Sequence, residues 1–266
     1  MKAELIDDPA DPRVADYREA RDGQLRSRAG LFLAEGRLVV RRLLEASRFR
    51  TRSLLLTHRA LDDLSDLLTG DDAPPVYLAS AETIRAVVGF KFHRGCLAAA
   101  VRGAPVRPEA LIEPPGPRTL LALEELADPD NVGAVFRNAA AFGAAGVLLS
   151  PGCTDPLYRK AIRVAMGATL STPFARADWP GGLTMLRAAG YTLVALTPDP
   201  AAQDIAAMVT GGLPSRRLAL VVGAEGDGLR ASTRAAADCR VRIPMTAGAD
   251  SLNVATACGI ALHRLA

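Results

Sequence analysis

The sequence predicts an α/β protein of two domains, in which a small N-terminal α/β domain precedes a larger domain with a mainly parallel sheet. Three observations support this fold class. Short apolar runs alternate with helical segments in the second half of the chain, which is the pattern of parallel strands covered by helices. A proline-rich segment at residues 106–117 divides the chain. Apolar residues make up 49% of the 266 residues, enough for a substantial core.

Residues 1–105 are predicted to form the small domain. Residues 34–46 have helical periodicity, with apolar side chains on one face and an arginine stripe on another. The stripe consists of Arg37, Arg41 and Arg48. Three short apolar runs predict strands at residues 53–57, 75–79 and 96–101. The arginine stripe is either a solvated helix face or a surface that contacts a polyanion, and the pattern alone does not separate the two.

Charge is unevenly distributed in this domain, although the net charge of +3 is too small to identify a nucleic-acid binder. Residues 13–59 hold twelve arginines against five acidic residues, whereas residues 62–82 hold six acidic residues and neither Lys nor Arg. We therefore expect an electrostatically polarised N-terminal part. The preference for Arg over Lys suits phosphate recognition but also follows from a GC-rich coding sequence.

A metal site, disulfide bonds and membrane-spanning segments are not expected. The four cysteines form no CxxC pair, and the three histidines stand at no ligand spacing from them. The N-terminus has no apolar signal region, and no apolar run approaches the roughly 18 residues of a membrane span. The sequence predicts a soluble, cytoplasmic protein without a metal site.

A linker is predicted at residues 106–117, because its prolines remove backbone donors and restrict their neighbours to extended conformations. The larger domain then covers residues 118–266. Its predicted strands are residues 120–124, 146–150, 192–197, 218–222 and 240–243. Polar or glycine-rich loops follow the first, fourth and fifth of these strands. Ligands of open α/β sheets lie beyond the carboxyl ends of the strands, so a site is expected at these loops.

The loop after the fourth strand reads GAEGDG, with glycines at 223, 226 and 228. This is neither the GxGxxG order of a dinucleotide site nor a phosphate loop, which argues against a Rossmann oxidoreductase and against an ordinary Rossmann-type methyltransferase. Glycines permit positive φ and close backbone approach to a flat ligand, and Glu225 adds a carboxylate. A tight strand-to-helix turn would explain the same residues equally well.

The C-terminal segment predicts a helix that begins near Ser251, with Ser251 as its N-cap and Asn253 in the same turn. Helix N-terminal amides form a natural anion site, although capping alone would also explain Ser251. The third loop leads into NVGAVFRNAAAF, in which Asn131 opens a helix and Arg137 lies further inside it. Because the surrounding helix is strongly apolar, Arg137 is predicted to be a buried cation with an anionic partner; an exposed surface position is the alternative.

Together the three elements resemble a known family. NVGAVFRNA, LVVGAEGDGL and VRIPM…SLNVATA match, in order and separation, the three motifs of the SpoU (TrmH-like) RNA 2′-O-methyltransferases of the SPOUT superfamily. The resemblance covers residue 120 to the C-terminus. FLAEGRLVVRRLLEA and GFKFHRGCLAA resemble, more loosely, the substrate-binding domain found at the N-terminus of many members. The family resemblance implies a trefoil-knot catalytic domain, S-adenosylmethionine as cofactor, RNA as substrate and a homodimer.

The resemblance also assigns residues. The positions that match the family's catalytic residues are Asn131, Arg137, Glu225, Ser251 and Asn253. The positions implied in cofactor binding are Thr197, Gly223, Ala224, Glu225, Gly226, Ile243, Pro244, Met245, Ser251, Leu252, Asn253 and Ala255. The residues expected to contact RNA are Arg37, Arg41, Arg94 and Arg137.

The implied reaction is attack of a ribose 2′-oxygen on a sulfonium methyl group, which requires in-line alignment and stabilisation of developing negative charge. Members of the family are sometimes described with the arginine at position 137 as the activating base. A guanidinium group stays protonated in proteins, so we expect Arg137 to clamp phosphate and stabilise the forming alkoxide.

Two other classes compete with this interpretation. A non-catalytic RNA-binding protein would keep the fold as a platform for dimers, but the motif residues Arg137, Glu225 and Asn253 are all present. A nucleotide-binding oxidoreductase would need a phosphate-binding glycine order that is absent. The sequence does not specify the modified nucleotide; ribosomal RNA is favoured over tRNA because the N-terminal domain resembles those of ribosomal-RNA-modifying members.

Overall fold

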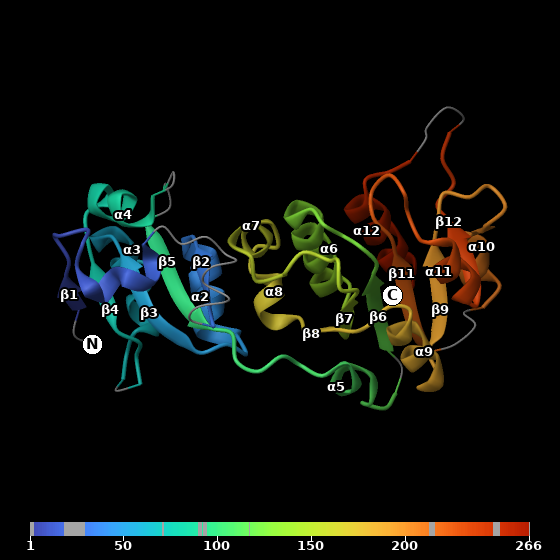
Figure 1. The fold of residues 1–266 in the computed structure, drawn as a ribbon, viewed down its shortest axis with the longest axis horizontal. Coiled ribbons are helices and arrows are strands. Elements are labelled where there is room, and N and C mark those ends of the chain that lie inside the picture. The colour runs from blue at the N-terminus through green and yellow to red at the C-terminus, as the bar shows by residue number, and fades with distance from the viewer. Residues whose placement is uncertain are drawn as a thin grey trace. The chain divides into compact units, whose positions relative to one another are not determined.

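The computed structural model of the chain describes residues 3–18, 30–70, 72–89, 92, 95–116, 118–212, 216–246 and 251–265. The chain forms two compact units (Figure 1). The first comprises residues 1–104 together with residues 157–171, and the second comprises residues 105–156 and 172–266. The sequence placed residues 157–171 in the second domain, whereas in the structure they pack with the first.

The first unit contains a five-stranded mixed sheet in the order β1-β4-β3-β5-β2. Its strands are β1 (Ala3–Leu5), β2 (Leu31–Glu35), β3 (Thr51–Leu56), β4 (Val76–Leu78) and β5 (Cys96–Val101). β4 pairs in parallel with β1 and β3, whereas β5 pairs antiparallel with β2 and β3. The three predicted strands are confirmed as β3, β4 and β5, and β1 and β2 were missed.

β2 was missed because its last residues had been assigned to the following helix. Gly36, with a φ of 100°, ends the strand and begins α2 (Arg37–Ala46). A residue with a side chain would be strained at this φ, so the change of direction depends on glycine. Val39, Val40 and Leu43 are the buried face of α2, and Arg48 lies beyond its end.

The remaining helical elements of the first unit are short. They are η1 (Pro12–Tyr17), α3 (His58–Asp62), η2 (Ser65–Leu67), α4 (Ala81–Val88), α7 (Arg159–Val164) and α8 (Ala168–Ser171). Tyr17 is fully buried in the core of this unit, where its hydroxyl lies 2.8 Å from the hydroxyl of Ser53. Burial raises the pKa of the Tyr17 phenol above its usual range, so the ring stays neutral.

Acidic side chains of a later segment face Arg37 and Arg41 of α2. The expected charge polarisation of the N-terminal part stays a prediction. Arg37 pairs with Asp63 at 2.5 Å, and Arg41 pairs with Asp66 at 2.7 Å. The acid-rich stretch of the sequence thus folds back against the arginine-rich one. Pairs this exposed each contribute only about 0–1 kcal/mol to stability, so they neutralise the surface more than they hold the unit together.

Residues 157–171 join the first unit through α7 and α8. Ala161 and Ile162 of α7 are buried, and α7 lies beside β2. The Arg159 guanidinium lies 3.8 Å from the buried carboxylate of Glu35. Arg42 of α2 donates a hydrogen bond to the carbonyl of Met166. Both apolar and polar contacts therefore tie this segment to the N-terminal sheet.

The second unit contains a seven-stranded sheet in the order β10-β12-β9-β11-β6-β7-β8, and every pairing recorded within it is parallel. Its strands are β6 (Arg118–Leu123), β7 (Gly146–Leu149), β8 (Phe174–Arg176), β9 (Thr192–Leu196), β10 (Gln203–Asp204), β11 (Arg217–Val222) and β12 (Cys239–Arg242). The mainly parallel sheet and its five predicted strands are confirmed. The short strands β8 and β10, at the two edges, were not predicted.

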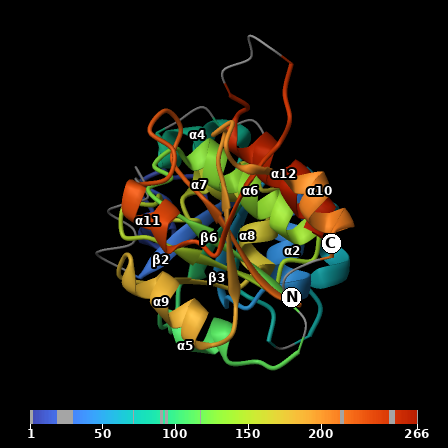
Figure 2. The ribbon, with the colours of Figure 1, turned by 90° about the vertical axis from the view of Figure 1, so that its right-hand side faces the viewer.

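Helices cover both faces of this sheet, as Figure 2 shows for the two sides of the strands. One side carries α5 (Pro108–Ile112), α9 (Gly181–Ala188) and α11 (Ala231–Ala236), and the other carries α6 (Pro129–Ala141), α10 (Ile205–Thr210) and α12 (Val254–Leu265). Successive residues of β6 and β11 are buried on alternate faces. This double burial explains why the strands are continuous apolar runs rather than alternating ones.

The predicted linker contains a helix. α5 begins at Pro108, where proline is favourable because the first helical residue needs no backbone donor. Leu111 and Ile112 are buried in the core of the second unit, packed with Leu120 and Leu148. The predicted linker at residues 106–117 therefore includes a short helix that packs into the core of the second unit. The knot implied by the family resemblance stays a prediction.

Candidate active site

A pocket of about 350 Å³ lies at the carboxyl ends of β9, β11 and β12 and at the start of α12. This volume is in the range of small-molecule sites. The lining residues are Leu196, Thr197, Pro198, Val222, Gly223, Ala224, Glu225, Gly226, Gly228, Ile243, Met245, Ser251, Leu252, Asn253, Val254 and Ala257. The pocket thus joins loops that are distant in the sequence, at the edge of the sheet where a ligand was expected.

All the residues that the family resemblance implied in cofactor binding line this pocket except Pro244 and Ala255. The sequence missed several apolar lining residues. These are Leu196, Pro198, Val222, Val254 and Ala257, together with Gly228. Each is a near neighbour of a predicted residue, and an apolar side chain at the end of a buried strand does not show in the sequence whether it faces core or pocket.

The loop that begins at Gly223 owes its shape to three glycines. Gly226 and Gly228 have φ values of 83° and 63°, and the Gly228 amide donates to the Ala224 carbonyl at 3.1 Å. A Cβ on Gly223 would lie 2.4 Å from the carbonyl carbon of Gly228. Gly223 is therefore required because the loop closes on its own backbone. The close approach of a ligand at Gly223, which the sequence suggested, stays a prediction, and Gly223 lines the pocket.

Asn253 joins all three predicted motifs through one side-chain amide. Its Nδ2 donates to Asn131 Oδ1 at 2.9 Å and to Glu225 Oε1 at 2.7 Å. Its Oδ1 accepts from the backbone amides of Ala255 at 2.9 Å and Thr256 at 3.3 Å. These partners fix which end of the amide is oxygen, because backbone N–H groups need an acceptor and a carboxylate needs a donor.

The N-cap of α12 is accordingly Asn253 and not Ser251, as the sequence had predicted. α12 begins at Val254, and Oδ1 of Asn253 satisfies the amides of its second and third residues. Ser251 is exposed and lines the pocket. Gly248, Ala249 and Asp250, which the sequence placed in the same turn, lie outside the described residues.

Asn131 is held inside α6 and is 7% exposed. Asp128, whose carboxylate accepts from the amide of Asp130 at 3.0 Å, caps this helix. Asn131 is therefore free of a capping role and uses its amide oxygen for Asn253. The structure thus brings Asn131, Glu225 and Asn253 together at hydrogen-bond distance.

Arg137 is exposed, and the expectation of a buried cation is wrong. α6 is amphipathic: Val132, Val135 and Phe136 are buried, while Arg137 falls on the solvent face. Among the described residues, no hydrogen bond or ion pair of Arg137 is found, and it does not line the pocket. The apolar residues around Arg137 in the sequence form the buried face of α6. Helical periodicity turns position 137 towards the solvent face.

α6 and α12 pack closely along a shared face. Asn138 Nδ2 donates to the Ala255 carbonyl at 2.7 Å, and a Cβ on Gly259 would lie 3.0 Å from that nitrogen. A shallow cavity of about 420 Å³ opens on this face, lined by residues of both helices that include Phe142 and Ile260. Ile260, which lines this cavity, is 37% exposed.

The other residues expected to contact RNA lie in the first unit. Arg37 and Arg41 are on α2, each paired with an acidic side chain. Arg94 lies outside the described residues. In the part of the chain that the structure describes, no group of His, Cys, Asp and Glu side chains is arranged to hold a metal ion. Within the same part, none of the helices has the length and hydrophobicity of a membrane span.

Fold and site together define an α/β protein with a small-molecule pocket at the carboxyl edge of a parallel sheet and the start of the C-terminal helix. The chain belongs to the SpoU rRNA Methylase family, whose model matches residues 118–263. These residues include all three motifs that meet through Asn253.

Similarity to known proteins extends over the first unit as well. An uncharacterised tRNA/rRNA methyltransferase of Mycobacterium tuberculosis is 45% identical over 261 residues, which cover 96% of this chain and 89% of that protein. The 23S rRNA (guanosine-2′-O-)-methyltransferase of Vibrio cholerae is 39% identical over 145 residues, covering 54% of this chain and 56% of that protein. The S-adenosylmethionine-bound rRNA methyltransferase of Sinorhizobium meliloti superposes with a TM-score of 0.80 at 26% identity, covering 99% of this chain and 97% of that one.

Proposed function

We propose that this protein is an S-adenosylmethionine-dependent RNA methyltransferase that transfers a methyl group to a ribose 2′-hydroxyl, with ribosomal RNA as the preferred substrate class. Membership of the SpoU rRNA Methylase family supports the reaction. The relatives named as 2′-O-methyltransferases of 23S rRNA support both the ribose oxygen and the RNA class. The observation that carries the proposal is the pocket at which Asn131, Glu225 and Asn253 meet.

The pocket suits S-adenosylmethionine in shape and charge. Leu196, Val222 and Ile243 contribute apolar wall for a flat base, and the glycine-rich loop contributes backbone polar groups. Glu225 places a carboxylate at the same pocket, where a cationic ligand would be favoured. When bound, this cofactor supplies a methyl group on a positively charged sulfur.

The chain's own residues would orient the reactants and stabilise charge. The amide of Asn253 holds the Glu225 carboxylate 2.7 Å away, so that the loop after β11 and the start of α12 keep a fixed separation. We assign Asn131 the role of holding the Asn253 amide in place. Asn131 is buried, and its Oδ1 accepts a hydrogen bond of 2.9 Å from Asn253 Nδ2. We assign Ser251, which is exposed and lines the pocket, a contact with the reacting hydroxyl or with the cofactor.

Arg137 supports a dimeric active site. Arg137 is exposed and does not line the pocket of its own chain, which fits an arrangement in which a second chain brings its pocket to this residue. The groove between α6 and α12, with Ile260 exposed, offers an apolar surface next to Arg137 for such a contact. We propose a homodimer in which Arg137 of one chain clamps substrate phosphate at the pocket of its partner and stabilises the forming alkoxide.

The binding assay that tests the proposal is calorimetry with S-adenosylmethionine and, as the matched ligand, NAD. We expect micromolar affinity for the first and none for the second. Mapping 2′-O-methyl groups in ribosomal RNA and tRNA from cells with and without the gene then identifies the substrate. Loss of a single site in ribosomal RNA is expected; NAD binding without S-adenosylmethionine binding would refute the proposal, and loss of a tRNA site alone would refute the preference for ribosomal RNA.

The dimeric site is tested by mixing two inactive chains, Arg137→Ala and Gly223→Val. The first lacks the clamp, and the second cannot close its cofactor loop, as the contact with Gly228 requires. Mixed dimers should regain some activity, because one of their two sites combines an intact Arg137 with an intact loop. Full activity of Arg137→Ala homodimers would refute the clamp, and the absence of rescue in verified mixed dimers would refute the arrangement across subunits.

A further inference from the structure

Glu124 is a carboxylate with 0% exposure at the end of β6, outside the pocket. Burying a charge without partners costs several kcal/mol, so its surroundings must satisfy it. Nothing in the three motifs assigns a role to this residue. Its contacts instead lead to the glycine-rich loop after β11, which here means residues 223–229.

Glu124 holds both ends of this loop. Its backbone amide donates to the carbonyl of Val222, the last residue before the loop, at 2.9 Å. Its carboxylate oxygen Oε2 accepts from the backbone amide of Arg230, the first residue after the loop, at 2.9 Å. The residue that directly follows β6 therefore sets how far apart the loop begins and ends.

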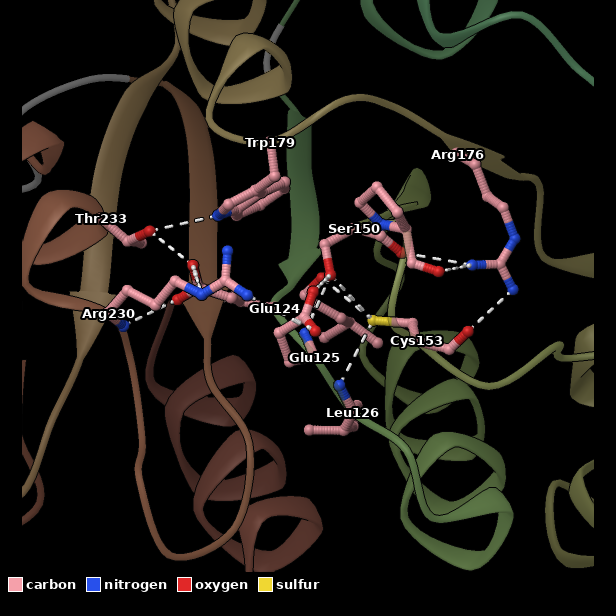
Figure 3. Close-up of polar contacts among 11 residues, drawn as sticks. Glu124, Glu125, Leu126, Ser150, Cys153, Arg176, Trp179, Arg230 and Thr233 are labelled. Atoms are coloured by element: carbon pink, nitrogen blue, oxygen red, sulfur yellow. Dashed lines mark hydrogen bonds and ion pairs between the residues drawn. The ribbon is translucent and has the colours of Figure 1, made fainter.

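The second carboxylate oxygen ties the loop to the helix that follows it. Oε1 accepts from the hydroxyl of Thr233 in α11 at 2.7 Å, and that hydroxyl accepts from the indole N–H of Trp179 at 3.1 Å (Figure 3). Thr233 is 1% exposed, so no water competes for these bonds. Charge-assisted bonds of this kind in a dry environment are the strong ones, and losing one partner leaves the other unsatisfied.

Glu125, the residue after Glu124, holds the end of β6 in place through a second set of contacts. Glu125 adopts a φ of 57°, which is held by Ser150: the serine hydroxyl accepts from the Glu125 amide at 2.9 Å and donates to its Oε1 at 2.8 Å. Arg230 reaches over both carboxylates, with Nη2 3.6 Å from Glu125 Oε2 (Figure 3). The end of β6, which leads to α6 and Asn131, is thus fastened to the end of the loop that carries Glu225.

We propose that Glu124 is a positioning residue that keeps the loop of residues 223–229 in the shape that binds S-adenosylmethionine. It contacts neither pocket nor substrate; it acts through the loop's two ends and through α11. This inference rests on the proposed function only for the identity of the ligand. Its structural part, that Glu124 orders the loop, holds for any occupant of the pocket.

Three variants test the proposal in the full-length protein. Glu124→Leu removes both carboxylate oxygens that accept hydrogen bonds. Thr233→Val removes the hydroxyl that donates to one of them. Glu124→Gln is the conservative variant, because its amide oxygen accepts from the Arg230 amide while its NH₂ group donates to the Thr233 hydroxyl. Glu35→Gln is the matched control, a second buried carboxylate at 5% exposure in the first unit.

Hydrogen exchange without cofactor gives a readout that needs no catalysis. In Glu124→Leu and Thr233→Val, amides of residues 223–230 should exchange faster than in the wild type, while those of β6, β9 and the first unit stay protected. By calorimetry, the Kd for S-adenosylmethionine should rise by roughly 10- to 100-fold in Glu124→Leu and by less than about 5-fold in Glu124→Gln. In turnover, the KM for the cofactor should rise more than kcat falls.

Wild-type exchange and affinity in a folded Glu124→Leu protein would overturn the proposal, and so would faster exchange spread evenly over both units. If Glu124→Leu does not fold, Thr233→Val must still show the local loosening. Glu35→Gln should leave both the loop exchange and the cofactor Kd unchanged; a change there equal to that of Glu124→Leu would also overturn it. Failure of the wild type to bind S-adenosylmethionine would instead refute the proposed function, and the exchange experiment would still decide the role of Glu124.

Discussion

The side-chain amide of Asn253 performs two tasks, of which the sequence predicted only the helix cap and assigned it to Ser251. Its oxygen caps α12, and its nitrogen bridges Asn131 and Glu225. Asparagine is suited to both because it is a good N-cap residue and carries two donors as well as an acceptor. Serine at the same position could cap the helix but could not donate to two oxygens. The site therefore depends on this residue type at this position.

Asn253→Asp separates the two tasks. The carboxylate keeps the cap but has no donor for Glu225, and the two carboxylates repel each other. Repulsion raises the pKa of the introduced group, so its folded-state value lies above its unfolded one. Stability is then present below the ordinary carboxyl range and is lost as pH rises through the raised pKa. We expect the Tm deficit of the variant against wild type to widen from pH 5 to pH 8; a constant deficit in thermal melts would contradict the bridge.

The sequence did not predict correctly which of the functional side chains are buried and which are exposed. It identified Arg137 and Asn131 as functional through the family motif, but it placed Arg137 in the interior because the neighbouring letters are apolar. It placed the cap at Ser251 because serine precedes the helical pattern, and the true helix begins later, at Val254. Glu124 had been treated as the last residue of an apolar strand. Two adjacent glutamates at the end of a buried strand, Glu124 and Glu125, were the available signal for it.

At the level of elements, the glycine-rich loop folds against its own backbone, so its shape does not depend on a bound ligand. Gly223→Ala puts a methyl group 2.4 Å from the Gly228 carbonyl carbon, where backbone must move. We expect the cofactor Kd to rise at least about 10-fold, with the change visible by calorimetry and with circular dichroism unchanged. Gly181→Ala is the matched control, because its Cβ would meet only Asp178 Cβ, at 3.9 Å. Equal affinities of the two variants would show that the loop tolerates a side chain.

α12 carries a thiol that reports on its packing. Cys258 is fully buried, and burial raises the pKa of its thiol from 9.0 to about 12. The folded form thus keeps its proton above the pH at which the unfolded chain releases it. Stability from this group is fully present below pH 9 and is lost as pH rises toward 12. In urea titrations, any stability advantage of wild type over Cys258→Ala should therefore shrink between pH 8 and pH 10; an unchanged difference would mean that the thiol is not buried in solution.

Elements were predictable where one local pattern decided them. The five central strands of the second unit are continuous apolar runs, and burial on both faces by helices makes such runs unambiguous. β8 and β10 are edge strands of three and two residues, too short for any period to emerge. α5 was not predicted because the prolines in and around it suggested a linker, although Pro108 starts the helix. The pairing of Arg37 with Asp63 spans 26 positions and depends on tertiary structure.

For the whole molecule, the two units divide the proposed labour between cofactor and RNA. All pocket residues lie in the second unit, so removing residues 1–104 should leave S-adenosylmethionine affinity within about 2-fold by calorimetry. RNA affinity should fall and its dependence on salt should flatten, because phosphate contacts are lost. A truncated protein that methylates the same RNA as well as the full chain would show that the first unit is not the recognition module.

That truncation also has a stability cost that the sequence did not predict. α7 and α8 lose their packing partners, which exposes Ala161 and Ile162 to water. We expect a lower Tm for the truncated protein than for the second unit within the full chain, in calorimetric scans. Carrying Ile162→Gln in the truncated form should reduce its tendency to aggregate, whereas in the full chain the same change should destabilise the first unit.

The chain passes between the two units three times, at residues 104–105, 156–157 and 171–172. Replacing residues 1–104 alone therefore does not exchange the whole first unit, whether by recombination or by protein engineering. A chimera that takes residues 1–104 from a relative would combine a foreign β2 and α2 with the native α7 and α8. Moving the whole first unit between relatives needs two inserts, and the second lies within the stretch that forms the second unit.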